Sequence, residues 1–173
     1  ITPDINVTQV SLYANTTSIV TSNSNYHSFG TNSFNIINQY IPTYQNISWK
    51  TISGGAVHTA GITSTGSLFT WGDNTYGQLG NNSNTNQSSP VQIVALSTWT
   101  STNAGYYHTI ATQTPGTLYA WGLNTYGQLG NNSNTTQSSP VQIGTSSGWT
   151  SVTGGLYHTA AVQTSGTLYT WGN

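Results

Sequence analysis

The sequence predicts an all-β fold made of β-propeller blades, each with four antiparallel strands, and three observations support this class. Trp and His recur every fifty positions, at Trp49, Trp99 and Trp149, at Trp71, Trp121 and Trp171, and at His58, His108 and His158. A fixed period of this length is typical of repeat architectures. Thr, Tyr, Trp, Val and Ile are plentiful, and they favour strands over helices. A single four-stranded sheet cannot bury both of its faces, so the repeats must stack, and radial stacking gives a propeller.

The repeat at residues 99–148 is the most regular. Four strands are predicted in it, at residues 99–102, 107–113, 117–121 and 140–143. Gly-containing pairs between the first three strands mark turns. The Asn- and Ser-rich stretch before the fourth strand, residues 131–139, is predicted to be a low-complexity, solvated loop.

The other parts of the chain are copies of this repeat with differing completeness. Residues 49–98 contain all four strands, residues 149–173 contain the first three, and residues 1–48 form a degenerate repeat with Phe29 in place of a tryptophan. Residues 1–173 are therefore expected to form one propeller domain with about four blades, as a fragment, a small ring or an open arc.

The N-terminus resembles the Pro-led fourth strand of the other repeats, in the residues Pro3, Asp4, Ile5 and Asn6. The chain is thus predicted to open with an outer strand and to close with a blade that lacks one. Unpaired strand edges are templates for association, and the edge charges that usually prevent it are missing here. We expect self-association by strand addition, with closure of the chain into a small ring as the alternative.

Charge is almost absent from the chain, since only Asp4, Lys50 and Asp73 are charged and they make up 2% of the residues. A single lysine gives no positively charged surface that could bind phosphates, so we expect no nucleic-acid partner. No apolar run approaches the roughly 20 residues that span a bilayer, so we expect no membrane insertion. Asp4 and Asp73 are the only carboxylates, and Leu123 replaces Asp73 in the next repeat, so we expect no pair of carboxylates for general acid–base catalysis. No Ser is marked as an activated nucleophile. The chain is therefore predicted to be non-enzymatic, with no catalytic residues, no metal and no cofactor.

The repeated His, Trp and Gly positions are predicted to be structural. His58, His108 and His158 could converge on a metal, but a residue present in every blade more often hydrogen-bonds to backbone groups. The repeated Trp residues are interpreted as packing between blades, with sugar stacking as the alternative. Gly72 and Gly122 are expected at turns that need a positive φ. Tyr106, Tyr107 and Tyr157 are the candidates for a glycan or protein ligand, because Ala56, Val57 and Leu156 fill corresponding places in other repeats.

The motifs G-G-A-V-H-T-A at 54–60, A-G-Y-Y-H-T-I at 104–110 and G-G-L-Y-H-T-A at 154–160 precede G-x-L-[FY]-x-W-G in each repeat. They resemble the regulator of chromosome condensation repeat, specifically over residues 49–173 and weakly over residues 1–48. The resemblance implies a propeller of four-stranded blades, usually seven. The family includes a guanine-nucleotide exchange factor and an ultraviolet photoreceptor that uses Trp beside its His-Thr pair. No Trp lies in the Gly-to-His segments here, which argues against light sensing.

The composition favours an extracellular or particle-surface protein, because scarcity of charge combined with abundant Ser, Thr and Asn is unusual for a crowded cytoplasm. We expect a structural or adhesive module, and a subunit of a homo-oligomeric surface assembly or filament. An intracellular scaffold or guanine-nucleotide exchange factor is the alternative. With so few carboxylates the histidines decide the response to acid. We expect tolerance of acid if they keep their hydrogen bonds when charged, and loss of stability if they are held neutral.

Overall fold

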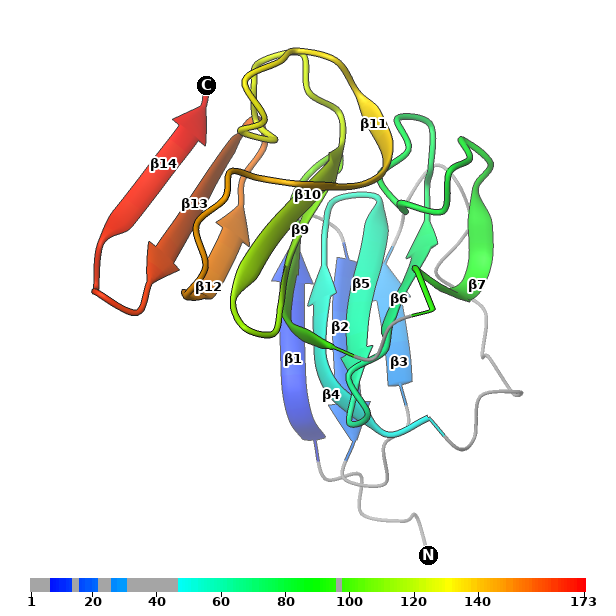
Figure 1. Cartoon of the computed structure of the whole chain (residues 1–173). Coiled ribbons are helices and arrows are strands. Elements are labelled where there is room, and N and C mark those ends of the chain that lie inside the picture. The colour runs from blue at the N-terminus through cyan, green and yellow to red at the C-terminus, as the bar shows by residue number, and fades with distance from the viewer. Residues whose placement is uncertain (1–6, 14–15, 22–25, 31–46, 96–97) are drawn as a thin grey trace, which may run out of the picture.

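A computed structural model describes the backbone of residues 7–13, 16–21, 26–30, 47–95 and 98–173, and the side chains of the last two ranges. All regular elements in these ranges are strands, and none is a helix. The strands form four antiparallel sheets that follow one another along the chain (Figure 1). The prediction of an all-β fold built of propeller blades is therefore confirmed.

Each sheet is one blade, and within it every strand pairs with the next strand of the sequence. Blade 1 contains β1 (Val7–Tyr13), β2 (Thr16–Thr21) and β3 (Tyr26–Gly30). Blade 2 contains β4 (Trp49–Gly54), β5 (His58–Thr63), β6 (Leu68–Gly72) and β7 (Gln87–Gln92). Blade 3 contains β8 (Trp99–Ala104), β9 (His108–Gln113), β10 (Thr117–Gly122) and β11 (Gln137–Gln142). Blade 4 contains β12 (Trp149–Gly154), β13 (His158–Gln163) and β14 (Leu168–Gly172).

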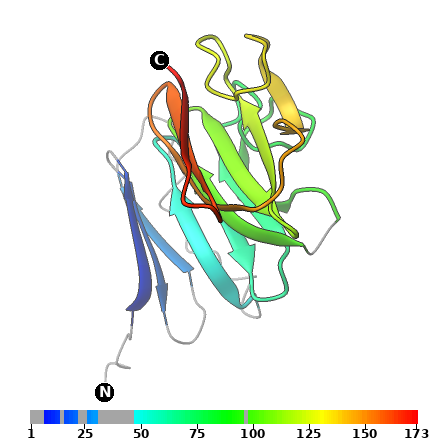
Figure 2. The same ribbon diagram turned by 60° about the vertical axis from the view of Figure 1, so that its left-hand side comes forward.

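The blades lie side by side in an arc, and blade 1 lies against β4 (Figure 2). Neighbouring blades meet through their first two strands, as β8 does with β4 and β5, and β12 with β8 and β9. The sheet faces are thus buried against each other, as expected for blades that cannot bury both faces alone.

The fourth strands differ from their prediction in where they begin. They were expected to start at Pro90 and Pro140, whereas β7 and β11 start three residues earlier, at Gln87 and Gln137. Proline cannot donate a ladder hydrogen bond and is tolerated on the outermost strand of a sheet, which β7 and β11 are. The predicted N-terminal outer strand, Pro3 to Asn6, lies outside the described residues.

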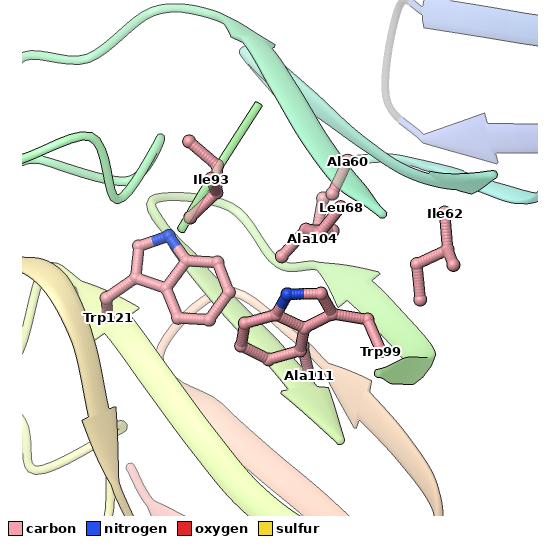
Figure 3. Close-up of a cluster of buried hydrophobic side chains, with 8 residues drawn as sticks. All are labelled: Ala60, Ile62, Leu68, Ile93, Trp99, Ala104, Ala111 and Trp121. Carbon is pink, nitrogen blue, oxygen red and sulfur yellow. The ribbon is translucent and has the colours of Figure 1, made fainter. Parts of the chain in front are cut away.

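The hydrophobic core lies between the blades. One cluster joins blades 2 and 3, and it is made of Ala60, Ile62, Leu68, Ile93, Trp99, Ala104, Ala111 and Trp121 (Figure 3). The rings of Trp99 and Trp121 meet edge to face with centroids 6.1 Å apart. A second cluster joins blades 3 and 4 in the same way, around Ile110, Leu118 and Trp149. Trp99, Trp121 and Trp149 therefore lie between blades, with Trp171 packed against the second cluster.

Equivalent tryptophans are not equally buried. Trp71 and Trp121 are buried, as predicted, but Trp171 is partly exposed. Trp171 lies on β14, which in the described chain has a hydrogen-bonded neighbour on one side only, β13. No strand of the described residues pairs with β14 as β11 pairs with β10.

Candidate functional site

A hydrogen-bond chain joins each complete blade to the next, and it contains the repeated histidines. Nε2 of His58 lies 2.8 Å from the Thr109 hydroxyl oxygen, and that hydroxyl donates to the Gln78 carbonyl oxygen at 2.7 Å. The Thr109 proton is therefore committed, so His58 must donate from Nε2. The Trp121 indole N–H donates to the same carbonyl at 2.9 Å.

The next junction repeats this arrangement. His108 Nε2 lies 3.0 Å from the Thr159 hydroxyl, which donates to the Gln128 carbonyl oxygen at 2.7 Å. The Trp171 N–H donates to that carbonyl as well, at 2.9 Å. The partner of His58 and His108 is thus a threonine hydroxyl of the next blade, where backbone groups had been expected. We call this set the interblade hydrogen-bond chain.

The histidines of this chain are held neutral. Burial lowers the pKa of His58 to about 3, and the nearby His108 adds to the shift. Burial likewise lowers the pKa of His108 to about 4, with a contribution from His158. Nδ1 of both rings is buried without a hydrogen-bond partner, so a second ring proton would have no acceptor. No group of three metal-ligating side chains occurs in residues 47–95 and 98–173.

Two glycines allow the third strand of a blade to end beside its histidine. Gly72 and Gly122 have φ of +116° and +102°. A Cβ on Gly122 would lie 2.5 Å from the Tyr107 carbonyl oxygen and 2.7 Å from the His108 Cα. A side chain at either position would therefore be strained.

The long loop after the third strand is organised by one buried asparagine. In blade 3 the Asn124 side-chain oxygen accepts from the Leu129 N–H, and its amide group donates to Asn131 Oδ1 and the Ser133 and Thr135 carbonyls. Asn74 makes the equivalent bonds in blade 2. The low-complexity composition had suggested only a solvated connection. These loops lie together at the upper side of the molecule in Figure 1.

Each loop brings a tyrosine to the connection between the first two strands of the next blade. Tyr76 meets Tyr107 with ring centroids 5.0 Å apart, and Tyr107 meets Tyr106 at 4.4 Å. We call these three residues the first tyrosine cluster. Tyr76 is 38% exposed. Partial burial raises the pKa of Tyr107, and the neighbouring Tyr106, Tyr76 and Asp73 raise it further.

A second tyrosine cluster lies one blade further on, where Tyr126 meets Tyr157 with centroids 4.6 Å apart. Tyr126 is 47% exposed, and Leu156, at the position of Tyr106, is 41% exposed. The structure therefore brings the candidates Tyr106 and Tyr107 together, and it places Tyr157 at the next junction. Sequence reasoning missed Tyr76 and Tyr126, although their fifty-residue spacing was visible. We call the two clusters the tyrosine rim.

The two clusters lie next to a buried glutamine whose hydrogen-bond acceptor is present in one blade and absent in the other. In blade 2 the Gln78 side chain accepts from the Tyr76 N–H and donates from Nε2 to the Asp73 carboxylate at 2.6 Å. In blade 3 Gln128 accepts from the Tyr126 N–H in the same way, but Leu123 stands in the place of Asp73. Nε2 of Gln128 is buried and has no hydrogen-bond partner.

Fold and interblade hydrogen-bond chain together define a repeat protein of the β-propeller class. The regulator of chromosome condensation (RCC1) repeat model matches residues 65–112 and 115–162, which is more than half of the chain. A second model of this repeat matches residues 49–78 and 99–128. The chain belongs to the RCC1 repeat family. No helix in the described ranges is long and apolar enough to cross a membrane.

Known proteins resemble this chain over part of their length. The ultraviolet-B receptor UVR8 of Arabidopsis thaliana is 52% identical over 42 residues, which are 24% of this chain and 10% of the receptor. Human WBSCR16 superimposes with a TM-score of 0.85 at 20% identity, over 96% of this chain and 47% of the solved chain. Yeast RCC1 (Prp20), solved bound to Kap60, superimposes with a TM-score of 0.82 at 19% identity, over 99% of this chain and 45% of the solved chain.

The fold also resembles the ectodomain of a receptor kinase. The CRINKLY ectodomain of ACR4 from Arabidopsis thaliana superimposes with a TM-score of 0.60 at 15% identity, over 98% of this chain and 51% of the solved chain. The chain thus spans about half of these solved propellers. At such identities the likeness concerns the fold, because unrelated functions share one fold.

Proposed function

We propose that this chain is a non-enzymatic, structural and adhesive propeller module of a cell or particle surface, which binds uncharged ligands through the tyrosine rim. The observation that carries the proposal is the exposure of aromatic side chains at equivalent places on two adjacent blade junctions. Tyr76 and Tyr126 are both more than a third exposed. Tyrosine joins a flat apolar face to a polar hydroxyl, and such residues are enriched where partners bind.

The charge distribution fits an uncharged ligand. Among the described residues Lys50 and Asp73 are the charged ones, and Asp73 is buried and hydrogen-bonded within its own loop. Neither an anionic nor a cationic partner finds a charged patch to steer it. Neutral glycans and neutral protein surfaces therefore suit the rim best. The low charge also supports a location outside the cell, and the CRINKLY ectodomain shows that the fold occurs in an ectodomain.

A glycan array tests the binding role. The double variant Tyr126→Ala/Tyr157→Ala removes the second cluster, and Thr145→Ala serves as the control, because Thr145 is exposed on the connection between β11 and β12 and belongs to neither the tyrosine rim nor the β14 edge. We expect the wild type and the control to retain neutral glycans or surface extracts that the double variant loses. Retention by the double variant would rule out the second cluster as the binding site.

Self-association through blade 4 is the second part of the proposed role. The β14 edge has no outer neighbour in the described chain, and Leu168 and Tyr169 are 61% and 44% exposed. An unpaired edge beside exposed apolar side chains is a template for strand addition. Deleting residues 1–6, the candidate donor strand, should shorten or abolish the assemblies while the circular dichroism spectrum stays that of the intact chain. Assemblies of unchanged size would exclude this donor.

An intracellular scaffold or exchange factor is the rival function, because yeast RCC1 (Prp20) was solved with Kap60 and studied for binding to Gsp1p and histones. The two functions predict different upstream gene sequences. A secretion signal supports the surface module, and a basic nuclear-targeting segment supports the rival.

A further inference from the structure

The second tyrosine cluster is built over a buried donor that the fold leaves without an acceptor. Gln128 is fully buried, and its Nε2 has no hydrogen-bond partner. A buried amide N–H without an acceptor loses its hydrogen bonds to water and gains none in return, so such groups are rare in protein structures. The orientation of the amide is fixed, because its Oε1 accepts from the Tyr126 N–H at 2.9 Å. Nε2 must therefore point away from that N–H.

Blade 2 shows what this donor binds when an acceptor is present. The equivalent Gln78 has the same bond from the Tyr76 N–H, and its Nε2 donates to an Asp73 carboxylate oxygen at 2.6 Å. The backbones match as well, since the Asp73 N–H bonds to the Val57 carbonyl and the Leu123 N–H bonds to the Tyr107 carbonyl, both at 2.9 Å. By this equivalence, Gln128 Nε2 points to a position that suits a carbonyl or carboxylate oxygen.

In blade 3 an apolar side chain, Leu123, stands at the position of the Asp73 acceptor. Leu123 is partly exposed, so we expect its side chain to change rotamer when an acceptor enters, as side chains at binding sites commonly do. The Tyr126 backbone N–H bonds to the Gln128 side chain, and the Tyr126 ring meets the Tyr157 ring. Leu156 adds 41% exposed apolar surface. No cation is available nearby in residues 98–173, which hold neither Lys nor Arg.

We propose that the second tyrosine cluster is a binding site for a neutral sugar that carries an acylamino group, an N-acetylhexosamine. The acetamido carbonyl accepts from Gln128 Nε2, and the sugar ring lies on Tyr126 and Tyr157. An amide carbonyl is the neutral counterpart of the Asp73 carboxylate, and it needs no counter-charge in the site. This inference rests on the proposed ligand-binding role of the tyrosine rim and names the ligand class at one of its two clusters.

The first cluster provides the internal control, because Asp73 already occupies its donor. Leu123→Asp gives blade 3 the residue of blade 2 and supplies Gln128 with an intramolecular acceptor. Asp73→Leu does the reverse and frees Gln78 Nε2. The pair of substitutions therefore closes one site and opens the other without removing a tyrosine.

The test is isothermal titration of the 173-residue protein with N-acetylglucosamine trimer, and with glucose trimer as the probe that lacks the acetamido group. We expect one site for the acetylated trimer and at least about tenfold weaker binding of the glucose trimer, the loss of one hydrogen bond. Leu123→Asp should lose at least about tenfold in affinity, while Asp73→Leu should raise the number of sites from one to two. The side-chain amide signals of Gln128 in nuclear magnetic resonance spectra should shift on titration.

Three results would overturn the proposal. Equal binding of both trimers, unaffected by Leu123→Asp, would leave the rim as a ligand site but remove the acetamido recognition. Preference for a galacturonate trimer would mean that the acceptor is a carboxylate. Absence of any saccharide binding, with Tyr126→Ala/Tyr157→Ala still reducing capture of protein ligands, would leave the adhesive role standing without a sugar. Should Leu123→Asp fail to fold, as judged by circular dichroism, Leu123→Asn supplies the same acceptor without charge.

Discussion

At the scale of single residues, a repeated side chain takes its role from the neighbouring blade. His58 is buried and donates to Thr109 of blade 3, whereas His158 is exposed because no blade follows it in the described chain. The local sequence H-T is the same in both places. The next blade therefore buries the imidazole and supplies its hydrogen-bond partner.

The first prediction concerns acid. The folded pKa values of about 3 for His58 and about 4 for His108 lie below the unfolded value of about 6.5. The unfolded chain therefore binds more protons below pH 6.5, so the free energy of unfolding falls as the pH drops towards the folded values. At pH 5 each histidine should cost on the order of 2 kcal/mol. Of the two outcomes that the sequence left open, this is the loss of stability expected when the histidines are held neutral.

Urea midpoints at pH 7.5 and pH 5 check this prediction. The variant His58→Gln/His108→Gln serves as the control, because the Gln amide can donate to the same threonine hydroxyls but does not titrate. Its midpoint should change much less between the two pH values than that of the wild type. An equal change in both proteins would place the acid sensitivity elsewhere.

The second prediction compares equivalent tryptophans. Trp121 is fully buried and donates to the Gln78 carbonyl, so Trp121→Ala should cost about 3 to 5 kcal/mol. Trp171 makes the equivalent bond to Gln128 but is partly exposed, so Trp171→Ala should cost clearly less. Chemical denaturation of both variants gives the comparison. Equal costs would mean that exposure on β14 does not weaken the packing of Trp171.

The sequence predicted those features of these residues that recur in every repeat. Fifty-residue spacing identified the repeated Trp and His positions and led to interblade packing for the tryptophans. It did not predict the Thr partner of the histidines, since periodicity says nothing about contacts between repeats. The Thr after each His was the available signal. The unpaired Gln128 was equally readable, because Leu123 replaces Asp73, but its meaning required the Gln78–Asp73 bond to be seen in three dimensions.

At the scale of elements, the long loops show how one residue orders a low-complexity segment. Asn124 satisfies backbone groups at residues 129, 133 and 135, so the loop has a defined shape despite its Asn- and Ser-rich sequence. Strand number and order were predictable from alternating strand-prone runs and turns. The starts of β7 and β11 were not, because pairing with the third strand extends them before the proline.

The third prediction uses the one difference between the two loops in residues 74–93 and 124–143. Asn86 Oδ1 accepts from the Asn74 N–H at 2.8 Å, and Thr136 stands in its place in blade 3. Thr136→Asn should restore this bond and stabilise the loop by about 0.5 to 1.5 kcal/mol. Asn124→Ala should release the same loop. Limited proteolysis should therefore cut residues 131–136 more slowly in the first variant and faster in the second, and identical cutting in all three proteins would refute the assignment.

At the scale of the whole molecule, the arc repeats one kind of junction between blades 2 and 3 and between blades 3 and 4, and β14 pairs on one side only in the described residues. Blades 2 and 3 have four strands, and each buries its inner face against the next blade. Blade 4 has three strands in the described chain, with Leu168 and Tyr169 exposed on the last of them. The four-stranded blade and its repetition followed from the sequence. A repeat pattern does not predict which strand pairs with the open edge of β14, because that strand can come from the same chain or from another copy.

The fourth prediction supplies that strand within the chain itself. A copy of residues 124–143 appended after Asn173 should pair with β14 as β11 pairs with β10, with the copies of Gln142 and Val141 opposite Tyr169 and Thr170. Covering the edge should raise the thermal midpoint, shift Trp171 fluorescence to shorter wavelength and leave the protein monomeric in sedimentation at concentrations where the 173-residue chain associates. A tail of the same residues in scrambled order should have none of these effects. Association that persists with the ordered tail would show that β14 is not the contact through which copies meet.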